Sequence, residues 1–389
     1  MPHGLYIQVP FCQTKCTYCN FHTGVFSAGL QSPYIRAVCR EMKMFREWSE
    51  PLGIASGAYA DLPISVDTVY VGGGTPSMLA AADLARLLES ARDTFLCHWT
   101  EVTLEADPET VTPERAAAWR AAGFDRVSLG AQSFDDRELA AAGRQHRRAD
   151  IYAADRVLRQ AGFANLSFDL IAGLAHQTRA SWSDSLQRLI DLHPEHISIY
   201  MLEIDEGSRL GAESLAGGSR YGAAALPSDD DVADSYDSAR ALLAVAGYEH
   251  YEISNWARPG FRSRHNLKYW QRGPYFGFGA GAHSFDGHIR WAKAHDPAAY
   301  TSAIEKNQWP IEQRQLVTPE QALEEELFLG LRQLCGIDVA ALEARYGRDL
   351  RARIAPLLEQ GLVELRGPTL RLAPARLTVS NEVFVSLLD

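Results

Sequence analysis

The chain has 389 residues, 46% of them hydrophobic, and a formal net charge of −11 at pH 7. This length is enough for one large domain of about 200 to 250 residues with a smaller domain beside it. The acidic balance argues against a protein that binds nucleic acid along its phosphate backbone, because such binding depends on clustered Lys and Arg.

Hydropathy and cysteine spacing narrow the class of protein further. No stretch reaches the roughly 18 apolar residues of a transmembrane helix, and no basic and apolar leader precedes the first apolar run at residue 5. Three of the six cysteines crowd into residues 12–19 and the others are scattered, which is unlike a disulfide framework. We therefore expect a cytoplasmic protein with a metal site and no transmembrane segment, while a peripheral membrane contact stays open.

Short β-rich runs alternate with helical patterns in the first half of the chain. Residues 33–48 carry an apolar stripe at helical spacing, and residues 112–122 begin at Thr112-Pro113 and stop before Gly123, so both predict helices. Repeated β-α units predict a parallel sheet, and six of them predict a partial TIM-like (β/α)6 barrel over residues 1–210. The predicted buried strands are 5–9, 68–71, 102–105, 126–130, 166–171 and 197–201.

Residues 211–317 have a different composition. The small and polar run 211–225 predicts a surface loop, and 229–246 predicts a helix that stops at Gly247. Residues 248–291 are rich in glycine and aromatics, which suits a loop-rich ligand-binding segment, although such aromatics also serve as packing. We expect this part to be a barrel extension.

The last part, residues 318–389, predicts a small α+β domain that resembles a winged helix. Helices are expected at 319–334, 339–346 and 350–360, followed by a hairpin of strands 362–365 and 369–372. Winged helices can read nucleic acid, but acidic residues interleave with the arginines of this part. A packing lid or a partner surface is the preferred interpretation.

A cysteine motif, Cys12-x3-Cys16-x2-Cys19, directly follows the first predicted strand. Three thiolates on one loop can bind three irons of a [4Fe–4S] cluster and leave the fourth iron without a protein ligand, as a chemically active cluster requires. The alternative is a structural zinc site with His22 as fourth ligand. Zinc sites of this kind combine one C-x2-C with a second C-x2-C or with H-x3-H, and this second half is missing here, so the cluster is favoured.

Glycines and polar residues stand near the ends of the next four predicted strands. Gly72-Gly73-Gly74-Thr75-Pro76 follows the second, and Glu105, Gln132 and Asp169 accompany the third, fourth and fifth. The carboxyl ends of parallel barrel strands meet at one rim, which is where barrel enzymes bind their ligands. Glycines there let the backbone approach a ligand closely. We expect a ligand site on this rim.

The motifs together resemble a known family. The cysteine spacing with Tyr18 before the last cysteine resembles the radical S-adenosylmethionine (SAM) superfamily. The resemblance implies that the open iron binds SAM and that an electron donor reduces the cluster, while the protein holds and shields the cofactor. The segments YIQVPFCQTKCTYCNF, VYVGGGTPS, GAQSF, FDLIAGL, YEISNWARPG and RHNLKYW are similar in order and spacing to the HemN/HemW group of that superfamily, over nearly the whole chain.

The resemblance also implies site residues, while the number of bound SAM molecules stays open. Arg144 suits a SAM carboxylate but is alternatively a surface charge, and Tyr6 is alternatively a packed barrel aromatic. Ala175-His176 and Met201 depart from the Pro-Gly and Gln usual in the group, which bears on the second SAM pocket. The matched positions are Tyr6, Gly74 and Glu105 for the cluster-bound SAM, and Tyr18, Thr75, Pro76, Gln132, Arg144 and Asp169 for a second SAM.

Two features indicate the branch of the group. Phe21 stands where the porphyrinogen-decarboxylating branch has a fourth cysteine. Residues His265-Asn266-x-x-Tyr269-Trp270 resemble a heme-associated motif, in which His265 is the expected axial ligand and the aromatics give flat apolar surfaces.

The resemblance therefore implies a HemW-type chaperone that binds heme and passes it to apo-haemoproteins. His250 and His283 are lesser heme candidates. The alternatives are a radical SAM enzyme acting on a porphyrinogen, as coproporphyrinogen III dehydrogenase does, or a methyl-transfer relative.

Overall fold

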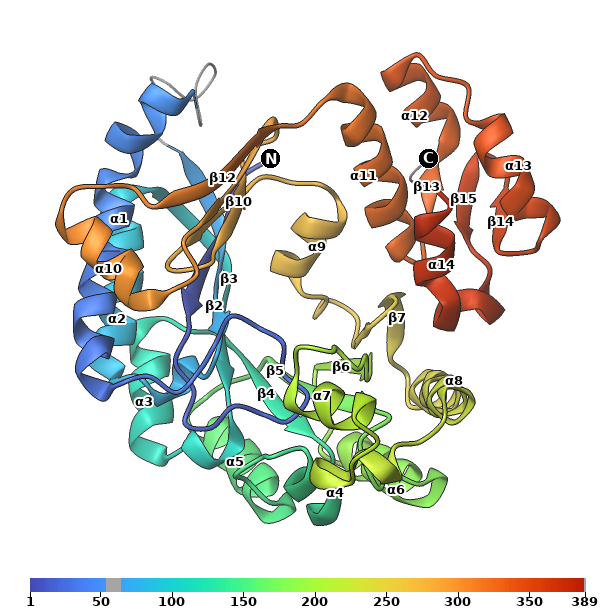
Figure 1. Cartoon of the computed structure of the whole chain (residues 1–389), viewed down its shortest axis with the longest axis horizontal. Coiled ribbons are helices and arrows are strands. Elements are labelled where there is room, and N and C mark those ends of the chain that lie inside the picture. The colour runs from blue at the N-terminus through green and yellow to red at the C-terminus, as the bar shows by residue number, and fades with distance from the viewer. Residues whose placement is uncertain (54–63, 388–389) are drawn as a thin grey trace.

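The computed structural model describes residues 1–53 and 64–387 (Figure 1). Over these residues, twelve strands form one sheet in the order β12-β11-β10-β9-β1-β2-β3-β4-β5-β6-β8-β7. None of the helices in this described part combines the length and hydropathy needed to cross a membrane.

The middle of the sheet contains six parallel strands that are neighbours in chain order. The helices that connect these strands, and α8 after the last of them, lie on the outer side of the sheet (Figure 1). This confirms the predicted partial (β/α)6 barrel and its six strands. The strands are β1 (His3–Val9), β2 (Ser65–Gly73), β3 (Leu96–Ala106), β4 (Arg126–Gln132), β5 (Leu166–Ala172) and β6 (His196–Met201), and the helices are α1 (Gln31–Ser49), α2 (Ala81–Thr94), α3 (Pro113–Ala122), α5 (Arg148–Gln160), α6 (Arg179–Asp191) and α8 (Asp229–Val245).

Helix α3 shows why the sequence signals for its ends were informative. The Thr112 hydroxyl accepts a hydrogen bond from the Arg115 backbone N–H, and Pro113 occupies the first turn, where no backbone donor is needed. Gly123 ends the helix with φ of 112°, a conformation that side chains rarely adopt. Both ends therefore lie where the sequence predicts them.

The strands of the barrel carry apolar side chains on one face and polar ones on the other. In β1, Leu5, Ile7 and Val9 are buried in the main hydrophobic core, while Tyr6 and Gln8 alternate with them and border the barrel interior. Alternation follows from the strand period of two residues. The interior of this barrel is consequently lined by polar and aromatic groups instead of a dry apolar filling.

Residues 211–317 extend the sheet at both edges. At one edge β8 pairs with β6, and at the other β9 runs parallel to β1 and is followed by the antiparallel strands β10, β11 and β12. The expectation of a loop-rich segment was therefore wrong, because the aromatic residues that suggested it are strong strand formers. The elements are β7 (Glu249–Glu252), β8 (Asn255–Ala257), α9 (Arg264–Trp270), β9 (Tyr275–Phe278), β10 (His283–Phe285), β11 (Ile289–Lys293), α10 (Pro297–Glu305) and β12 (Ile311–Leu316).

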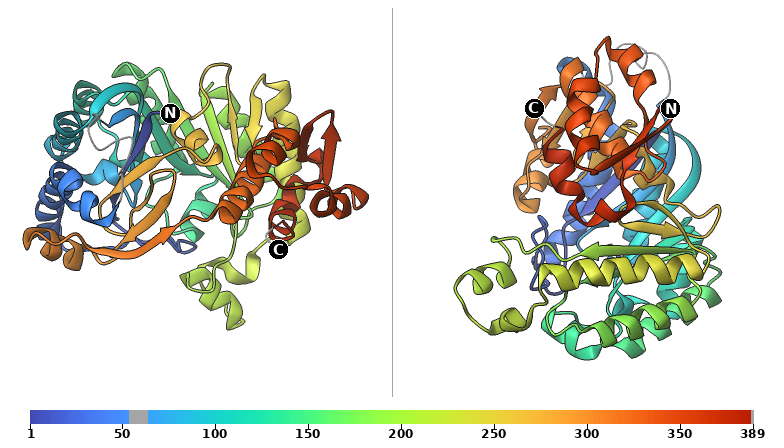
Figure 2. Two further views of the ribbon diagram at one scale, coloured as in Figure 1. Left: turned by 90° about the horizontal axis from the view of Figure 1, so that it is seen from above. Right: turned by 90° about the vertical axis from the view of Figure 1, so that its right-hand side faces the viewer.

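The predicted surface loop 211–225 contains helical structure. Helix α7 (Arg209–Leu215) is capped by the Ser208 hydroxyl, which accepts from the Gly211 backbone N–H at 2.9 Å. A 3-10 turn follows over Arg220–Ala225, and both elements project from the barrel (Figure 2). The cap, Ser208, lies before this run, so the composition of residues 211–225 gave no sign of it.

The C-terminal domain contains the predicted three helices and hairpin. Its strands form a second antiparallel sheet in the order β13-β15-β14, of which β13 had not been predicted, and neither had α14. Arg345, Arg348 and Arg353 form ion pairs with glutamates of α11, which supports a packing role for them. The elements are α11 (Pro319–Arg332), β13 (Ile337–Asp338), α12 (Val339–Tyr346), α13 (Arg351–Glu359), β14 (Val363–Arg366), β15 (Thr369–Leu372) and α14 (Ser380–Val385).

Candidate functional site

The loop that carries the three predicted cluster cysteines follows β1 and is closed at its base. The Cys12 backbone N–H donates to the Gly24 carbonyl at 2.9 Å, and the Gly24 N–H donates to the Pro10 carbonyl at 3.0 Å. Thr17 fixes the middle of the loop, since its N–H and hydroxyl donate to the carbonyls of Ala142 and Ala141 at the end of α4 (Asp136–Ala141). The loop is thus held at both base and centre.

The three thiols form a donor set that fits an iron–sulfur cluster. All six cysteines of the chain are free, and those of the motif are partly exposed. The Arg144 guanidinium donates to the Cys16 Sγ at 3.4 Å, so a positive charge lies beside this sulfur. Burial raises the pKa of the Cys12 thiol, a cost that a bound cation offsets.

The zinc alternative gains no support from the geometry. His22, its proposed fourth ligand, places its ring 3.8 Å from that of His295. Across residues 1–53 and 64–387, no group of three or more His, Cys, Asp or Glu side chains gathers closely enough to hold one metal ion. Thiolates of a cubane bind different irons, so they need not converge on one point.

The glycine triplet at the end of β2 is hydrogen-bonded to the cysteine loop. The Gly74 N–H donates to the Val9 carbonyl and the Thr75 N–H donates to the Phe11 carbonyl, both at 2.7 Å. A Cβ on Gly74 would lie 2.5 Å from the Phe11 carbonyl oxygen and 2.9 Å from the Cys12 Sγ. Only glycine fits between these two segments.

We therefore expect Gly74→Ala to displace the cysteine loop and lower the iron bound after anaerobic reconstitution. Overpacking of this kind costs about 1–3 kcal/mol. Iron and sulfide analysis measures the effect. Gly29→Ala is the matched control, because the nearest atom to its added Cβ lies 3.6 Å away. Equal iron content in the two variants would contradict the steric argument.

Glu105 lies inside the barrel below the glycine turn. Its carboxylate accepts hydrogen bonds from the Gly73 N–H at 2.9 Å and from the Tyr70 hydroxyl at 2.8 Å. Burial raises the pKa of Glu105 to about 7, although these two hydrogen bonds act in the opposite direction. Tyr6 is nearby and donates to the Gln8 side-chain oxygen at 2.6 Å. Tyr70 and Gln8 had not been predicted; strand alternation was the only signal for them.

The residues matched to a second SAM form two groups. Arg144 contacts Asp107 in an ion pair and donates to the Gly130 carbonyl at 3.0 Å, while Thr75 donates to Asp107 at 3.0 Å. The Arg144 side chain is only 9% exposed, so its interpretation as a surface charge was wrong. Asp107 is the member of this group that the sequence reasoning missed.

The remaining predicted residues border the same rim or lie below it. Gln132 ends β4 with φ of 64°, and Pro76 is buried in a short turn after Thr75. Tyr18 packs against a small apolar cluster that includes Ile171. Asp169 lies in the middle of β5 instead of at its end, where the Ser128 hydroxyl donates to it at 3.4 Å and burial raises its pKa.

The RHNLKYW segment forms helix α9, which lies on the inner side of the barrel (Figure 1). Glu101 of β3 accepts the backbone N–H groups of Arg264 and His265, both at 2.9 Å, so a buried carboxylate caps this helix. His265 and Tyr269 share one face of α9, since they are four residues apart. Trp270 instead contacts the Arg332 guanidinium of α11 at 4.4 Å.

The imidazole of His265 has both nitrogens engaged. Its Nδ1 lies 2.9 Å from the Thr68 hydroxyl and its Nε2 lies 2.9 Å from the Tyr269 hydroxyl. The residue is 1% exposed, and burial lowers its pKa to about 3. The ring is therefore neutral and presents no open nitrogen in this structure, unlike the axial ligand expected from the motif.

The other heme candidates are distributed differently. Asn266 is half-buried in the first turn of α9, where its backbone N–H donates to the Ser263 hydroxyl. His250 stacks on Trp256 with ring centroids 4.0 Å apart. His283 is exposed and borders a cavity inside the barrel.

That cavity, called the lumen cavity here, has a volume of about 440 Å³. It brings residues matched to SAM, Tyr6 and Glu105, beside Tyr269 of α9 and beside Phe21 of the cysteine loop. Small-molecule sites have this size and mixture of aromatic and polar walls. Its full lining is Tyr6, Gln8, Phe21, His22, Gly73, Glu105, Tyr269, Tyr275, Gly281, Ala282 and His283.

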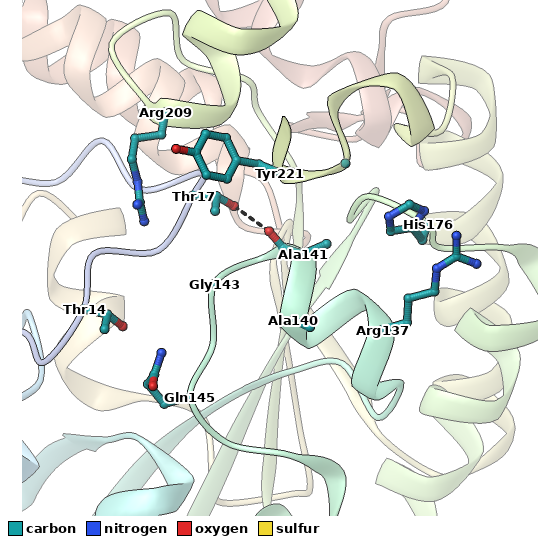
Figure 3. A pocket seen from close by; sticks show the side chains of 11 residues that line it. Thr14, Thr17, Arg137, Ala140, Ala141, Gly143, Gln145, His176, Arg209 and Tyr221 are labelled. Atoms are coloured by element: carbon teal, nitrogen blue, oxygen red, sulfur yellow. Dashed lines mark hydrogen bonds between the residues drawn. The ribbon is translucent and has the colours of Figure 1, made fainter. Parts of the chain in front are cut away.

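A second cavity of about 630 Å³ borders the other side of the cysteine loop (Figure 3). Thr17 of the loop bonds to Ala141 at the end of α4, and Arg209 and Tyr221 of the projecting segment also line the cavity. His176, one of the departures noted in the sequence, also lines it and has φ of 69°. None of the residues matched to SAM or heme lines this second cavity.

Comparison with known proteins gives consistent similarities. Residues 6–189 match the radical SAM superfamily, and residues 317–375 match the HemN C-terminal domain. The chain is 35% identical over 391 residues to the heme chaperone HemW of Mycobacterium tuberculosis, covering 100% of this chain and 95% of that protein. It is 32% identical to the heme chaperone HemW of Bacillus subtilis, covering 98% of each.

A solved structure shares the fold. Coproporphyrinogen III oxidase (HemN) from Escherichia coli, a radical SAM enzyme, superposes with a TM-score of 0.82 at 22% identity, covering 99% of this chain and 90% of that one. At this identity the likeness concerns the fold alone.

Proposed function

Since this chain belongs to the HemW family of the radical SAM superfamily, we propose that it binds heme and delivers it to apo-haemoproteins. The lumen cavity is the observation that carries the proposal. Tyr269 of the heme-associated motif, Tyr275 and Phe21 all line it, and aromatic rings give the apolar surface against which a macrocycle packs.

We assign the iron–sulfur cluster to Cys12, Cys16 and Cys19, with SAM on the open iron. A bound cluster of this kind supplies one-electron reduction of SAM. The chain's own contribution is to hold the loop through Thr17, to contact the Cys16 sulfur through Arg144, and to offer Tyr6 and Glu105 to SAM. Thiols kept free in this way suit a reducing compartment such as the cytoplasm.

Heme binding is tested by titrating the anaerobically reconstituted protein with hemin and then adding an apo-haemoprotein. We expect saturable binding, followed by transfer to the acceptor. Phe21→Ala should weaken binding because it removes part of the cavity wall. Val25→Ala is the matched control, since Val25 is on the same loop with similar exposure, 65% against 67%, and does not line the cavity.

An anaerobic assay with SAM, a reductant and coproporphyrinogen III separates chaperone from enzyme. Phe21 supplies no fourth thiolate, so we expect little substrate conversion. Turnover of porphyrinogen at enzymatic rates would contradict the proposal, and so would heme that stays bound in the presence of every acceptor tested.

Glu105 predicts a pH dependence of SAM binding. The carboxylate attracts the cationic cofactor only when it is ionised, and its pKa in the SAM-free protein is about 7. Lowering the pH from 8 to 6 should protonate it and weaken SAM binding about tenfold, because the pH falls one unit below that pKa. Equilibrium binding of SAM to the reconstituted protein measures this.

Glu105→Gln is the control for that dependence. The variant should bind SAM more weakly than the wild type at pH 8 and about equally at pH 6, because only the wild type loses a charge over this range. An affinity ratio that stays constant between the two pH values would exclude titration of Glu105 as the cause.

A further inference from the structure

The second cavity, on the side of the cysteine loop away from the lumen cavity, has a basic lining without any carboxylate. Its 11 lining residues include the arginines Arg137 and Arg209 and the histidine His176, but no aspartate or glutamate (Figure 3). The chain as a whole carries a net charge of −11, so this wall departs from the charge of its surroundings. Such a wall attracts an anionic group.

The two arginines of this lining differ in what they contact. The backbone N–H of Arg137 donates to Asp135 at 2.8 Å, whereas its exposed guanidinium makes no hydrogen bond or ion pair within the described part of the chain. Arg209 donates to the Lys15 carbonyl of the cysteine loop and lies over the Tyr221 ring at 5.3 Å. Arg209 therefore joins the projecting segment to the loop, while the charge of Arg137 is available to a partner.

Exposed positive charge continues beyond the lining residues. Arg147, Arg148 and Arg220 are exposed, and each stands within three residues of a lining residue in the chain. Two carboxylates of the same segments bond to backbone groups: Asp136 accepts the Arg148 N–H at 2.7 Å, and Glu213 accepts the Arg220 N–H at 3.1 Å. The cavity is thus part of a basic patch on an acidic protein.

One wall of the second cavity lies directly against a cluster cysteine. Gly143 and Thr17 line the cavity, and a Cβ on Gly143 would lie 3.3 Å from the Thr17 Cγ2 and 3.7 Å from the Cys16 Cα. The lumen cavity borders the same loop through Phe21 and His22, and the two cavities share no lining residue. Cys16 is therefore one residue behind a wall that faces away from the lumen cavity.

The shape of the second cavity fits a protein surface better than a small molecule. Small-molecule sites enclose most of their ligand, whereas about 630 Å³ here is bordered by five exposed residues. Complexes between electron-transfer proteins use small, charged interfaces that form quickly, and opposite charges raise their association rate. The exposed lining residues are Thr14, Arg137, Ala140, Gln145 and Arg209.

From these observations we propose that the second cavity is the docking site of an acidic electron-transfer protein, which reduces the cluster across the wall formed by Thr17 and Gly143. The inference rests on the proposed cluster at Cys12, Cys16 and Cys19. The donor carries a low-potential flavin or iron–sulfur centre. It loses one electron and the cluster gains it, and no bond or proton is exchanged in this step. Docking on this side leaves the lumen cavity to SAM and heme.

The test uses the full-length, anaerobically reconstituted protein and two acidic donors, a flavodoxin and a ferredoxin. Wild type, Arg137→Glu, Arg137→Gln and Arg156→Glu are compared by equilibrium binding of each oxidised donor and by the rate at which each reduced donor reduces the cluster. Arg156 of α5 is the matched control. It is also exposed, its guanidinium has no hydrogen bond or ion pair to any residue that the structure describes, and it does not line the cavity.

We expect Arg137→Glu to lower the second-order rate constant of reduction about tenfold and to weaken donor binding by a similar factor, because a local attraction becomes a repulsion. Arg137→Gln should lie between this variant and the wild type, and Arg156→Glu should equal the wild type. Added salt should bring Arg137→Glu and the wild type together, since it screens exposed charges. Dithionite should reduce the cluster of all four proteins to the same extent, which shows that each cluster is intact.

Equal donor binding and equal reduction rates in the wild type and Arg137→Glu overturn the inference. Failure of both donors to reduce a wild-type cluster that dithionite reduces does the same. Tight binding of inorganic pyrophosphate that Arg137→Glu abolishes, with donor reduction unchanged, also overturns it and assigns the cavity to a small anion. In all three cases the proposed function stands. A wild type that holds no cluster after reconstitution overturns the cluster assignment, and the docking site with it.

Discussion

Cys16→Ser will leave the anaerobically reconstituted protein with less than about a tenth of the wild-type iron and sulfide, because a serine hydroxyl is a poor replacement for a soft thiolate on iron. Cys16 is the most informative of the three positions. Its Sγ accepts a hydrogen bond from the Arg144 guanidinium at 3.4 Å, and the following residue, Thr17, bonds the loop to α4. Removing the thiol thus takes away a ligand without disturbing the backbone contacts of the loop.

The matched control is Cys335→Ser. Cys335 is a free, exposed cysteine of the C-terminal domain, and its thiol contacts the adjacent Gly336 carbonyl. This variant should retain full iron and sulfide, the visible absorption of the cluster and its electron paramagnetic resonance signal after reduction. Full iron in Cys16→Ser, or loss of iron in Cys335→Ser, would show that the cluster is held elsewhere.

The barrel and its cysteine loop could be predicted from the sequence, because strand patterns and cysteine spacing are local features of the chain. The predicted strand 166–171 ends one residue before the observed β5, whereas 102–105 covers only the last part of the longer β3. The cysteine spacing likewise lies within one loop. Parallel strands then bring their carboxyl ends to one rim, so Gly74, Glu105 and Gln132 could be grouped without knowing any contact.

Contacts between distant parts of the chain could not be predicted in this way. Asp107 was missed because its importance comes from Arg144, which is 37 residues away. The pairing of β9 with β1 joins segments more than 260 residues apart, and no local pattern encodes it. His265 was expected to have an open nitrogen, whereas Thr68 and Tyr269 occupy both, which depends on the packing of α9 inside the barrel.

Helix α9 is held in the barrel by charged side chains at both of its ends. Glu101 caps the helix from β3, and the Lys268 ammonium pairs with Asp67 at 2.7 Å, so the helix is held by charges at both ends. The HNxxYW spacing then directs His265 and Tyr269 inward and Trp270 toward the C-terminal domain. One short motif therefore serves both the lumen cavity and the contact between domains.

A buried ion pair gives the largest expected effect on stability. Glu41 of α1 and Lys293 of β11 are 0% and 1% exposed, with Oε1 and Nζ 2.6 Å apart. The Glu41 carboxylate also accepts from the Tyr300 hydroxyl at 2.5 Å, from the Trp309 indole N–H at 2.9 Å and from the Gly279 N–H at 3.0 Å. Burial lowers the pKa of Lys293, and the Glu41 carboxylate acts in the opposite direction.

Glu41→Ala should therefore lower the free energy of unfolding by about 3–5 kcal/mol, since it leaves several buried donors without their acceptor and a buried ammonium without its counter-ion, with the Gly277 carbonyl as its remaining partner. Denaturant titration of the cluster-free protein measures this. Asp184→Ala is the control: it breaks the exposed Arg188–Asp184 pair and should change stability by less than about 0.5 kcal/mol.

The double variant Glu41→Met/Lys293→Met separates the two contributions. Two apolar side chains of similar length remove both charges, so the cost of an unpaired ammonium disappears and part of the lost stability should return. Recovery should be incomplete, because the donors of Tyr300, Trp309 and Gly279 still lack an acceptor. A loss below about 1 kcal/mol in Glu41→Ala would mean that water or rearrangement satisfies Lys293, and the pair would then not be what holds β11 to α1.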